Sequence, residues 1–167
     1  MTQTATELVP HIQSLLGNDL LDAYLSYDMT TLVVKSNAVI NALKTLKEDE
    51  KLDFHFMTDL CGVHYPTNKG LELGVVYHLH NFKTNIRIRI ETFFSELDPR
   101  LETATTLWPA ANWMERETYD FYGIIFEGHP DLRRILNMDD LGMFPMLKYN
   151  PLEDQTRTDK NDKMFGR

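Results

Sequence analysis

The chain has 167 residues, of which 43% are hydrophobic, and it carries a formal net charge of −8. This content predicts one compact domain with a polar tail, and the acidic balance argues against a nucleic-acid partner, because phosphate binding needs a basic surface. Cys61 is the only cysteine, which excludes a disulfide framework and an iron–sulfur cluster held by this chain alone, and which indicates a reducing compartment.

No apolar run approaches the roughly 20 residues of a membrane-spanning helix. The first ten residues, MTQTATELVP, have neither a basic region with an apolar core nor an arginine-rich pattern, so we expect no leader peptide. Any association with a membrane should therefore come through other subunits.

The N-terminal part of the chain predicts two helices separated by a hairpin. A capping box at Thr4 and Glu7 opens the first helix, which Gly17 ends; its apolar stripe is Leu8, Ile12, Leu15 and Leu16. Residues 20–28 and 31–35 read as a hairpin with a turn around Met29. Ser36 is expected to cap the second helix, whose inward side chains are Val39, Ile40, Leu43 and Leu46.

Three strand-like runs follow at residues 53–65, 71–80 and 85–91. In the last run, isoleucines at 86, 88 and 90 alternate with charged residues at 87, 89 and 91, which is typical of a sheet with one buried face. The order helix, two strands, helix, three strands predicts an α+β fold with helices on one face of a mainly antiparallel sheet. The other face would be free to meet a partner, and short helices and an extended tail would follow.

A charged stretch, ERETYDFYGI, begins at Glu115. We expect a helix capped by Asn112 and ended by a left-handed Gly123, with Met114, Thr118, Phe121, Tyr122 and then Ile125 on its core face. On the opposite side, Arg116 and Asp120 are four residues apart and could form an ion pair. Glu115, Glu117 or Asp120 could serve as a general acid or base if its pKa were raised; we favour a structural or interface network.

The next stretch, EGHPDLRRIL, carries a histidine and two arginines. Gly128 permits an unusual backbone angle, and Pro130 suits the start of a short helix near whose end Arg133 and Arg134 would lie. His129 is either a proton carrier or a hydrogen-bonding turn residue, and we favour the turn. The predicted division is an α+β domain at residues 1–126, including the charged helix, and an extended segment at 127–167 that lies on partner subunits.

A zinc site is a further hypothesis, because Cys61 and His64 are three residues apart and His78 and His80 alternate on one strand. Arg87 and Arg89 in the next strand would repel a cation if they shared that face. We therefore prefer no metal site. Nucleotide-binding loops, G-x-S-x-G and H-E-x-x-H motifs are absent from the sequence.

Residues 115–136 resemble the signature of the C subunit of proton-pumping NADH:quinone oxidoreductase, the thirty-kilodalton subunit family of respiratory complex I. The matching positions are Glu115, Arg116, Glu117, Asp120, Phe121, Tyr122, His129, Arg133, Ile135 and Leu136. The lead-in TTLWPAANWMERE and the run TDLCGVHYP also resemble the family. The segment GMFPMLKYNPLED from Gly142 departs from the G-H-P-L-R-K-D-like pattern of many members, and the end at Arg167 does not match the form in which the C and D subunits are fused.

The resemblance implies a non-catalytic, peripheral-arm subunit that holds the quinone-reducing module together during electron transfer from NADH to quinone, which is coupled to proton translocation. It implies packing against the D and B subunits and near the iron–sulfur subunits, on the cytoplasmic side of a bacterial inner membrane. Iron–sulfur clusters, FMN and quinone would belong to partners, and this chain would hold no cofactor. The signature, with Gly123, Pro130 and Arg134, would form an interface. The alternatives are the corresponding subunit of a membrane-bound hydrogenase and a free-standing metal or acid–base enzyme.

Overall fold

The structure, a computed structural model, describes residues 5–151 and has the predicted α+β architecture. Within this range the elements are α1 (Val9–Leu16), β1 (Leu20–Ser26), β2 (Met29–Val34), α2 (Val39–Glu48), β3 (Phe56–His64), β4 (Leu73–Asn81), β5 (Ile86–Phe94), β6 (Arg100–Glu102), α3 (Ala111–Tyr122) and β7 (Ile125–Glu127). Short 3-10 turns at Ala5–Leu8, Gly17–Asp19 and Ser36–Ala38 flank the first two helices. None of the helices in residues 5–151 has the length and hydrophobicity that a membrane crossing requires.

Five strands form one sheet in the order β1-β2-β5-β4-β3. All neighbours in it are antiparallel except β2 and β5, which run parallel because the chain crosses over through α2, β3 and β4 between them. β6 and β7 form a separate parallel pair. The prediction of a mainly antiparallel sheet is confirmed.

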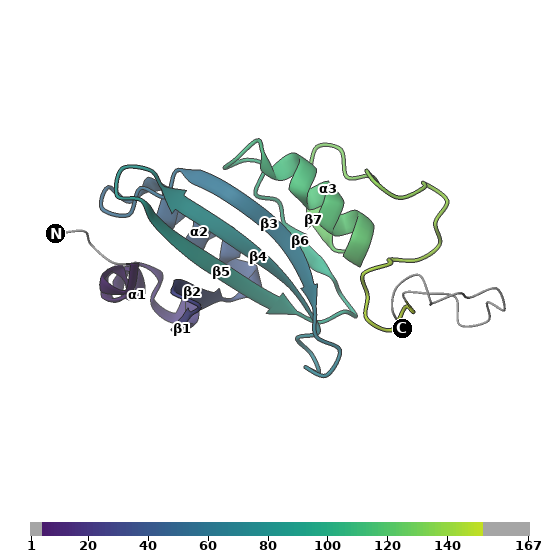
Figure 1. The fold of residues 1–167 in the computed structure, drawn as a ribbon, viewed down its shortest axis with the longest axis horizontal. Coiled ribbons are helices and arrows are strands. Elements are labelled where there is room, and N and C mark those ends of the chain that lie inside the picture. Colours follow the sequence, from purple (N-terminus) through teal and green to yellow (C-terminus); the bar gives the residue numbers. More distant parts are fainter. Residues whose placement is uncertain (1–4, 152–167) are drawn as a thin grey trace, which may run out of the picture.

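The hydrophobic core lies between one face of the sheet and the helices α1 and α2, and Figure 1 shows α2 behind the strands. Ile12, Leu43 and Leu46 are fully buried against Leu79 and Ile88 of the strands. Leu15, however, is 40% exposed, so the predicted stripe of the first helix is wrong at that position. The reason is that α1 is only eight residues long and contacts the core through a narrow stripe.

The glycine stops are confirmed, whereas the testable side-chain caps are wrong. Gly17 (φ 52°) and Gly123 (φ 78°) follow α1 and α3 with the positive φ that glycine adopts easily. Ser36 makes no capping bond, because a 3-10 turn precedes α2, and Asn112 lies inside α3 rather than before it. Thr4 lies outside the described residues.

The opposite face of the sheet is open within residues 5–151 and carries polar side chains. Tyr24 donates its hydroxyl hydrogen to Glu91 at 3.0 Å, and Arg89 Nε donates to His78 Nε2 at 3.1 Å. Arg89 and Glu91 also form an ion pair at 3.8 Å. The alternation predicted for β5 is confirmed, since Ile86, Ile88 and Ile90 are buried while the residues between them are exposed or half-buried.

Candidate functional site

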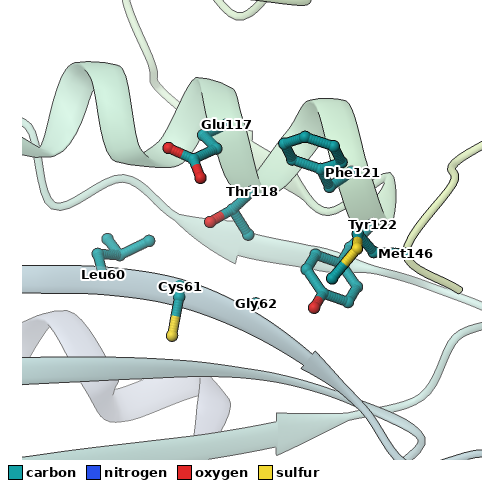
Figure 2. Close-up of a pocket in the computed structure, with 8 residues that line it drawn as sticks. All are labelled: Leu60, Cys61, Gly62, Glu117, Thr118, Phe121, Tyr122 and Met146. Carbon is teal, nitrogen blue, oxygen red and sulfur yellow. The ribbon is translucent and has the colours of Figure 1, made fainter. Parts of the chain in front are cut away.

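The helix α3 lies along β3, at the edge of the sheet (Figure 1). Gly62 makes this approach possible, because an added Cβ there would lie 2.5 Å from the ring of Tyr122. Figure 2 shows the side chains that line the groove between the two elements, a space of about 350 Å³. Glu117 and Phe121 come from α3, Leu60 and Cys61 from β3, and Met146 from the later segment.

Charged side chains of α3 are among its most buried residues. Glu115 and Asp120 are 0% exposed and Arg116 is 7% exposed, whereas Glu117 is exposed. Of the predicted core face, Thr118 is buried, while Met114, Phe121, Tyr122 and Ile125 are half-buried. The helix therefore has packed neighbours on both sides, and three of its four charged side chains face protein rather than solvent.

The predicted ion pair between Arg116 and Asp120 is wrong. Asp120 Oδ1 instead accepts from Arg134 Nη1 at 2.7 Å. Its Oδ2 accepts the backbone N–H groups of residues 135, 136 and 137 at 3.1, 2.8 and 2.9 Å. Burial alone would raise the pKa of Asp120, but these N–H groups and the guanidinium outweigh it and hold the pKa well below its usual range.

The two arginines bind backbone carbonyl groups of the segment that follows β7. Arg116 donates to the carbonyls of residues 133 and 134, at 3.2 and 3.0 Å, and its guanidinium lies 5.2 Å from the ring centre of Trp113. Arg134 donates to the carbonyls of Leu141 and Met143 at 2.6 and 3.0 Å. Side chains thus satisfy the backbone groups that a helix would have used. For this reason residues 128–151 form turns, and the short helix expected at Pro130 is absent from them.

Glu115 binds the loop that precedes α3. Its two carboxylate oxygens accept from Thr103 Oγ1 and from the Ala104 N–H, both at 2.6 Å. Burial raises the pKa of Glu115 to about 7, although these two hydrogen bonds act in the opposite direction. A raised pKa is what general acid–base chemistry requires, but the side chain is fully enclosed and its contacts fasten a loop.

His129 occupies a turn, with both ring nitrogens hydrogen-bonded. Nε2 donates to the Asn112 carbonyl at 3.1 Å, and Nδ1 accepts from the Asp131 N–H at 3.0 Å. Gly128 before it has φ 81°, the unusual angle that was predicted. Pro130 is exposed, and Arg133 forms an exposed pair with Asp131 at 2.9 Å.

The far end of the segment is anchored by residues that the sequence did not single out together. His64, whose side chain is fully buried, accepts the Lys148 N–H at Nδ1 at 2.9 Å, and the ring of Tyr149 lies edge-on, 5.3 Å away. Leu147 is 8% exposed and packs into the core. The separation of 84 positions between His64 and Lys148 explains why no local pattern could reveal the pair.

The candidate zinc residues do not converge. His78 pairs with Arg89 and His80 with Arg87 across β4 and β5, so these histidines share a face with the arginines. His64 is three positions from Cys61 on the same strand and therefore points to the face of the sheet opposite to that of Cys61. In residues 5–151 no group of three histidine, cysteine or acidic side chains could hold a metal ion. Burial also raises the pKa of the Cys61 thiol, which disfavours the reactive thiolate.

Residues 32–156 match the family of the respiratory-chain NADH dehydrogenase 30 Kd subunit. The chain belongs to this family. It is 38% identical over 152 residues to the C 1 subunit of NADH-quinone oxidoreductase of Rhizobium meliloti (strain 1021), which covers 91% of the chain and 75% of the relative. It is 41% identical over 122 residues to the C subunit of the same enzyme of Streptomyces coelicolor (strain ATCC BAA-471 / A3(2) / M145), which covers 73% and 49%. The chain thus spans about half to three quarters of the length of these curated relatives.

Two solved structures are similar to this family member. The trypsin-resistant fragment (1–134) of Nqo5 is 29% identical, with a TM-score of 0.63, over 76% of the chain and 98% of the fragment. A chain of the membrane-bound sulfane sulfur reductase, an archaeal respiratory membrane complex, is 25% identical, with a TM-score of 0.74, over 88% and 85%. The curated relatives are thus subunits of NADH-quinone oxidoreductase, and the second solved structure belongs to another respiratory membrane complex.

Proposed function

We propose that the chain is a non-catalytic peripheral-arm subunit of complex I that holds the quinone-reducing module together. Its partners would be the D and B subunits and the nearby iron–sulfur subunits, which would carry the clusters, FMN and quinone, while this chain holds no cofactor. The module would lie on the cytoplasmic side of the bacterial inner membrane, attached through other subunits. Family membership supports the assignment to complex I, and the geometry around α3 supports the role of holding subunits together.

The observation that carries the proposal is how the charges of α3 are used. Asp120, Arg116 and Arg134 form hydrogen bonds with one another or with the chain's own backbone. These bonds fix the segment that follows β7. Five large apolar side chains of this segment instead face outward: Leu136, Met138, Met143, Met146 and Tyr149 are 65%, 70%, 41%, 51% and 61% exposed. A fixed segment with exposed apolar side chains is what a protein–protein interface needs.

The signature residues would therefore act as positioning residues for an interface. We propose that the division at residues 126 and 127 separates the folded domain from the segment that partners cover. Trp113, 59% exposed beside the buried Arg116, would extend the same surface. Cofactor chemistry would take place in the neighbouring subunits.

Affinity purification of the full chain from membranes, with mass spectrometry of its partners, tests the proposal. We expect the D and B subunits, the iron–sulfur subunits and a flavin-bearing NADH-oxidising subunit. A chain found only as a free soluble species, in cells that contain an intact complex, would contradict it. A matched pair of variants tests the surface: Leu136→Asp should reduce assembly, whereas Leu97→Asp, at a position 91% exposed in the loop after β5, should not.

The second candidate is the corresponding subunit of a related membrane complex, such as a membrane-bound hydrogenase. The likeness to a chain of the archaeal sulfane sulfur reductase complex favours this alternative. Both candidates use the same interface, and they differ in the partner set. Recovery of a hydrogenase large subunit without any flavin-bearing NADH-oxidising partner would select the second candidate.

A further inference from the structure

β1 forms the edge of the sheet on the side opposite α3 (Figure 1). It is seven residues long, and within the described residues it pairs only with β2. Exposed edge strands are usually short, bulged or charged, because their unpaired backbone groups attract other strands. The irregularity between Leu20 and Asp22 interrupts only the first part of this edge.

The hairpin turn defines which backbone groups of β1 point outward. Tyr27 and Asp28 both have positive φ, at 48° and 62°, as in the two-residue turn that makes the flanking residues a hydrogen-bonded pair. Alternation along an antiparallel pair then turns the N–H and C=O groups of Ala23 and Leu25 away from β2. The Ala23 N–H donates to the carboxylate of its neighbour Asp22 at 2.8 Å, which agrees with this direction.

The side chains along this edge are apolar and exposed. Leu21 and Leu25 are each 60% exposed, and Tyr24 is 41% exposed. A hollow of about 270 Å³ adjoins them, lined by Val9 and Pro10 of α1 together with Ala23, Tyr24, Leu25 and Thr30. An added strand would satisfy the Leu25 N–H and the outward C=O groups, would replace the Asp22 carboxylate at the Ala23 N–H, and would also cover these side chains.

The charge of the edge indicates the chemistry of the added strand. Asp22 and Asp28 have no ion-pair partner in the described part of the chain, while Asp19 pairs with Lys35 at 3.5 Å. A second copy would bring one acidic edge against another, and the whole chain already has a net charge of −8. Like charges across an interface oppose association, whereas lysine or arginine beside apolar residues would complement it.

We infer that β1 is the docking site for an extended strand of a neighbouring subunit, apolar in its centre and flanked by lysine or arginine. This inference rests on the proposed function, because the neighbour is a subunit of the same complex. The strand adds to the sheet through the backbone of Ala23 and Leu25. Its basic residues lie near Asp22 and Asp28.

Hydrogen–deuterium exchange of the full chain, free and in the purified complex, tests this site. The amide of Leu25 should exchange at least about tenfold more slowly in the complex, as expected for an amide that gains a hydrogen-bonded partner, whereas the Ala23 amide already donates to Asp22 in the free chain and should change less. Unchanged exchange in a chain that co-purifies with the complex overturns the inference and leaves the proposed function intact. A chain that does not co-purify contradicts the proposed function itself. Protection that grows with the concentration of the free chain would indicate a second copy and would also overturn the inference.

Two variant pairs separate the backbone contribution from the charge contribution. Leu25→Pro removes an amide that points away from β2, so it should reduce incorporation into the complex more than Leu25→Ala does. Asp22→Lys should reduce incorporation by about tenfold, as expected for losing a close charge pair, while Glu50→Lys, a matched change at an exposed position after α2, should not. The comparison of Asp22→Lys with Glu50→Lys keeps the test valid if the proline variant fails to fold. Equal incorporation of Asp22→Lys and Glu50→Lys would overturn the inference.

Discussion

The two halves of α3 bury a carboxylate each, and the two environments are opposite in character. Glu115 faces the loop at residues 103 and 104 and receives two hydrogen bonds without an ion-pair partner in the described chain. Asp120 faces the segment after β7 and receives three backbone N–H groups together with a guanidinium. Both side chains are 0% exposed, yet the pKa of Glu115 is raised and that of Asp120 is lowered.

The number and charge of the donors, rather than burial, therefore decide whether each of these buried carboxyl groups stays ionised. The Asp120 region is held by charge-assisted hydrogen bonds, which are roughly twice as strong as neutral ones. The Glu115 region favours the neutral acid. The two regions should therefore respond to mutation and to pH in different ways.

The largest effect is expected for Asp120→Ala. Removing this carboxylate leaves Arg134 and three N–H groups without their partner, which should cost about 3–5 kcal/mol in the free energy of unfolding. Urea denaturation followed by circular dichroism measures it. Asp131→Ala, which breaks an exposed pair with Arg133, is the control and should cost less than about 1 kcal/mol. Equal losses in the two variants would show that the Asp120 region is not held by charge.

Glu115→Gln should change the pH dependence of stability. Because the pKa of folded Glu115 is raised to about 7 from an ordinary 4.5, the folded state binds the proton more tightly. The contribution of Glu115 to the free energy of unfolding is therefore fully present below about pH 4.5 and is lost as the pH rises to about 7. The loss amounts to about 3 kcal/mol. The glutamine variant should lack this loss.

Urea denaturation at pH 4.5 and pH 8 measures the difference, and Glu117→Gln, at an exposed position of the same helix, is the control. The window is separate from that of Asp120, whose lowered pKa makes its stabilisation present above about pH 3.8 and lost only at more acidic pH. A glutamine variant with the pH dependence of the control would show that Glu115 is ionised as easily as a surface residue.

Gly62→Ala probes the apolar contact of α3, away from both carboxylates. The new Cβ would lie 2.5 Å from the Tyr122 ring, so α3 or the ring must move, at a cost of about 1–3 kcal/mol. Thermal unfolding measures it against Gly142→Ala, where no atom lies within 4 Å of the added Cβ. A melting temperature equal to that of the control would mean that α3 is not packed tightly on β3.

Trp113→Ala should have the smallest effect in the free chain. The variant loses the contact between the indole ring and the Arg116 guanidinium, which is worth about 0.5–1 kcal/mol. Tyr27→Ala, at a side chain 98% exposed, should change the free energy of unfolding by less than about 0.5 kcal/mol. A loss above about 2 kcal/mol at Trp113 would indicate that the Arg116 side chain depends on the ring for its position.

Much of the fold could be predicted from local patterns. Alternation in β5, the inward residues of α2 and the stops at Gly17 and Gly123 depend on neighbours a few positions away, and the structure confirms them. The predicted helix caps at Ser36 and Asn112 are wrong, although both residue types are good cap formers. The helical backbone already begins at or before each of these residues, so neither occupies the capping position.

The sequence predicted which residues make up the candidate site, but it did not predict the contacts that these residues make. The sequence placed Glu115, Arg116, Asp120 and Arg134 close together along the chain, and the resemblance to the family singled them out. The predicted ion pair required Arg116 and Asp120 to be solvent-exposed neighbours on the helix. In the structure, residues of a later segment form the hydrogen bonds to both side chains instead. Local spacing carries no information about that later segment.

By itself, then, the sequence determined the periodic elements, the single core and the family of this protein, because side-chain periodicity and the signature are local properties. Only the tertiary structure decided which charges are buried, which partners they take and which way the pKa of each carboxyl group moves. The partners of Asp120 lie 14–17 residues away and those of Glu115 lie 11 and 12 residues away. The folded backbone brings them together, since a carboxylate in the interior takes whichever donors the packing presents to it.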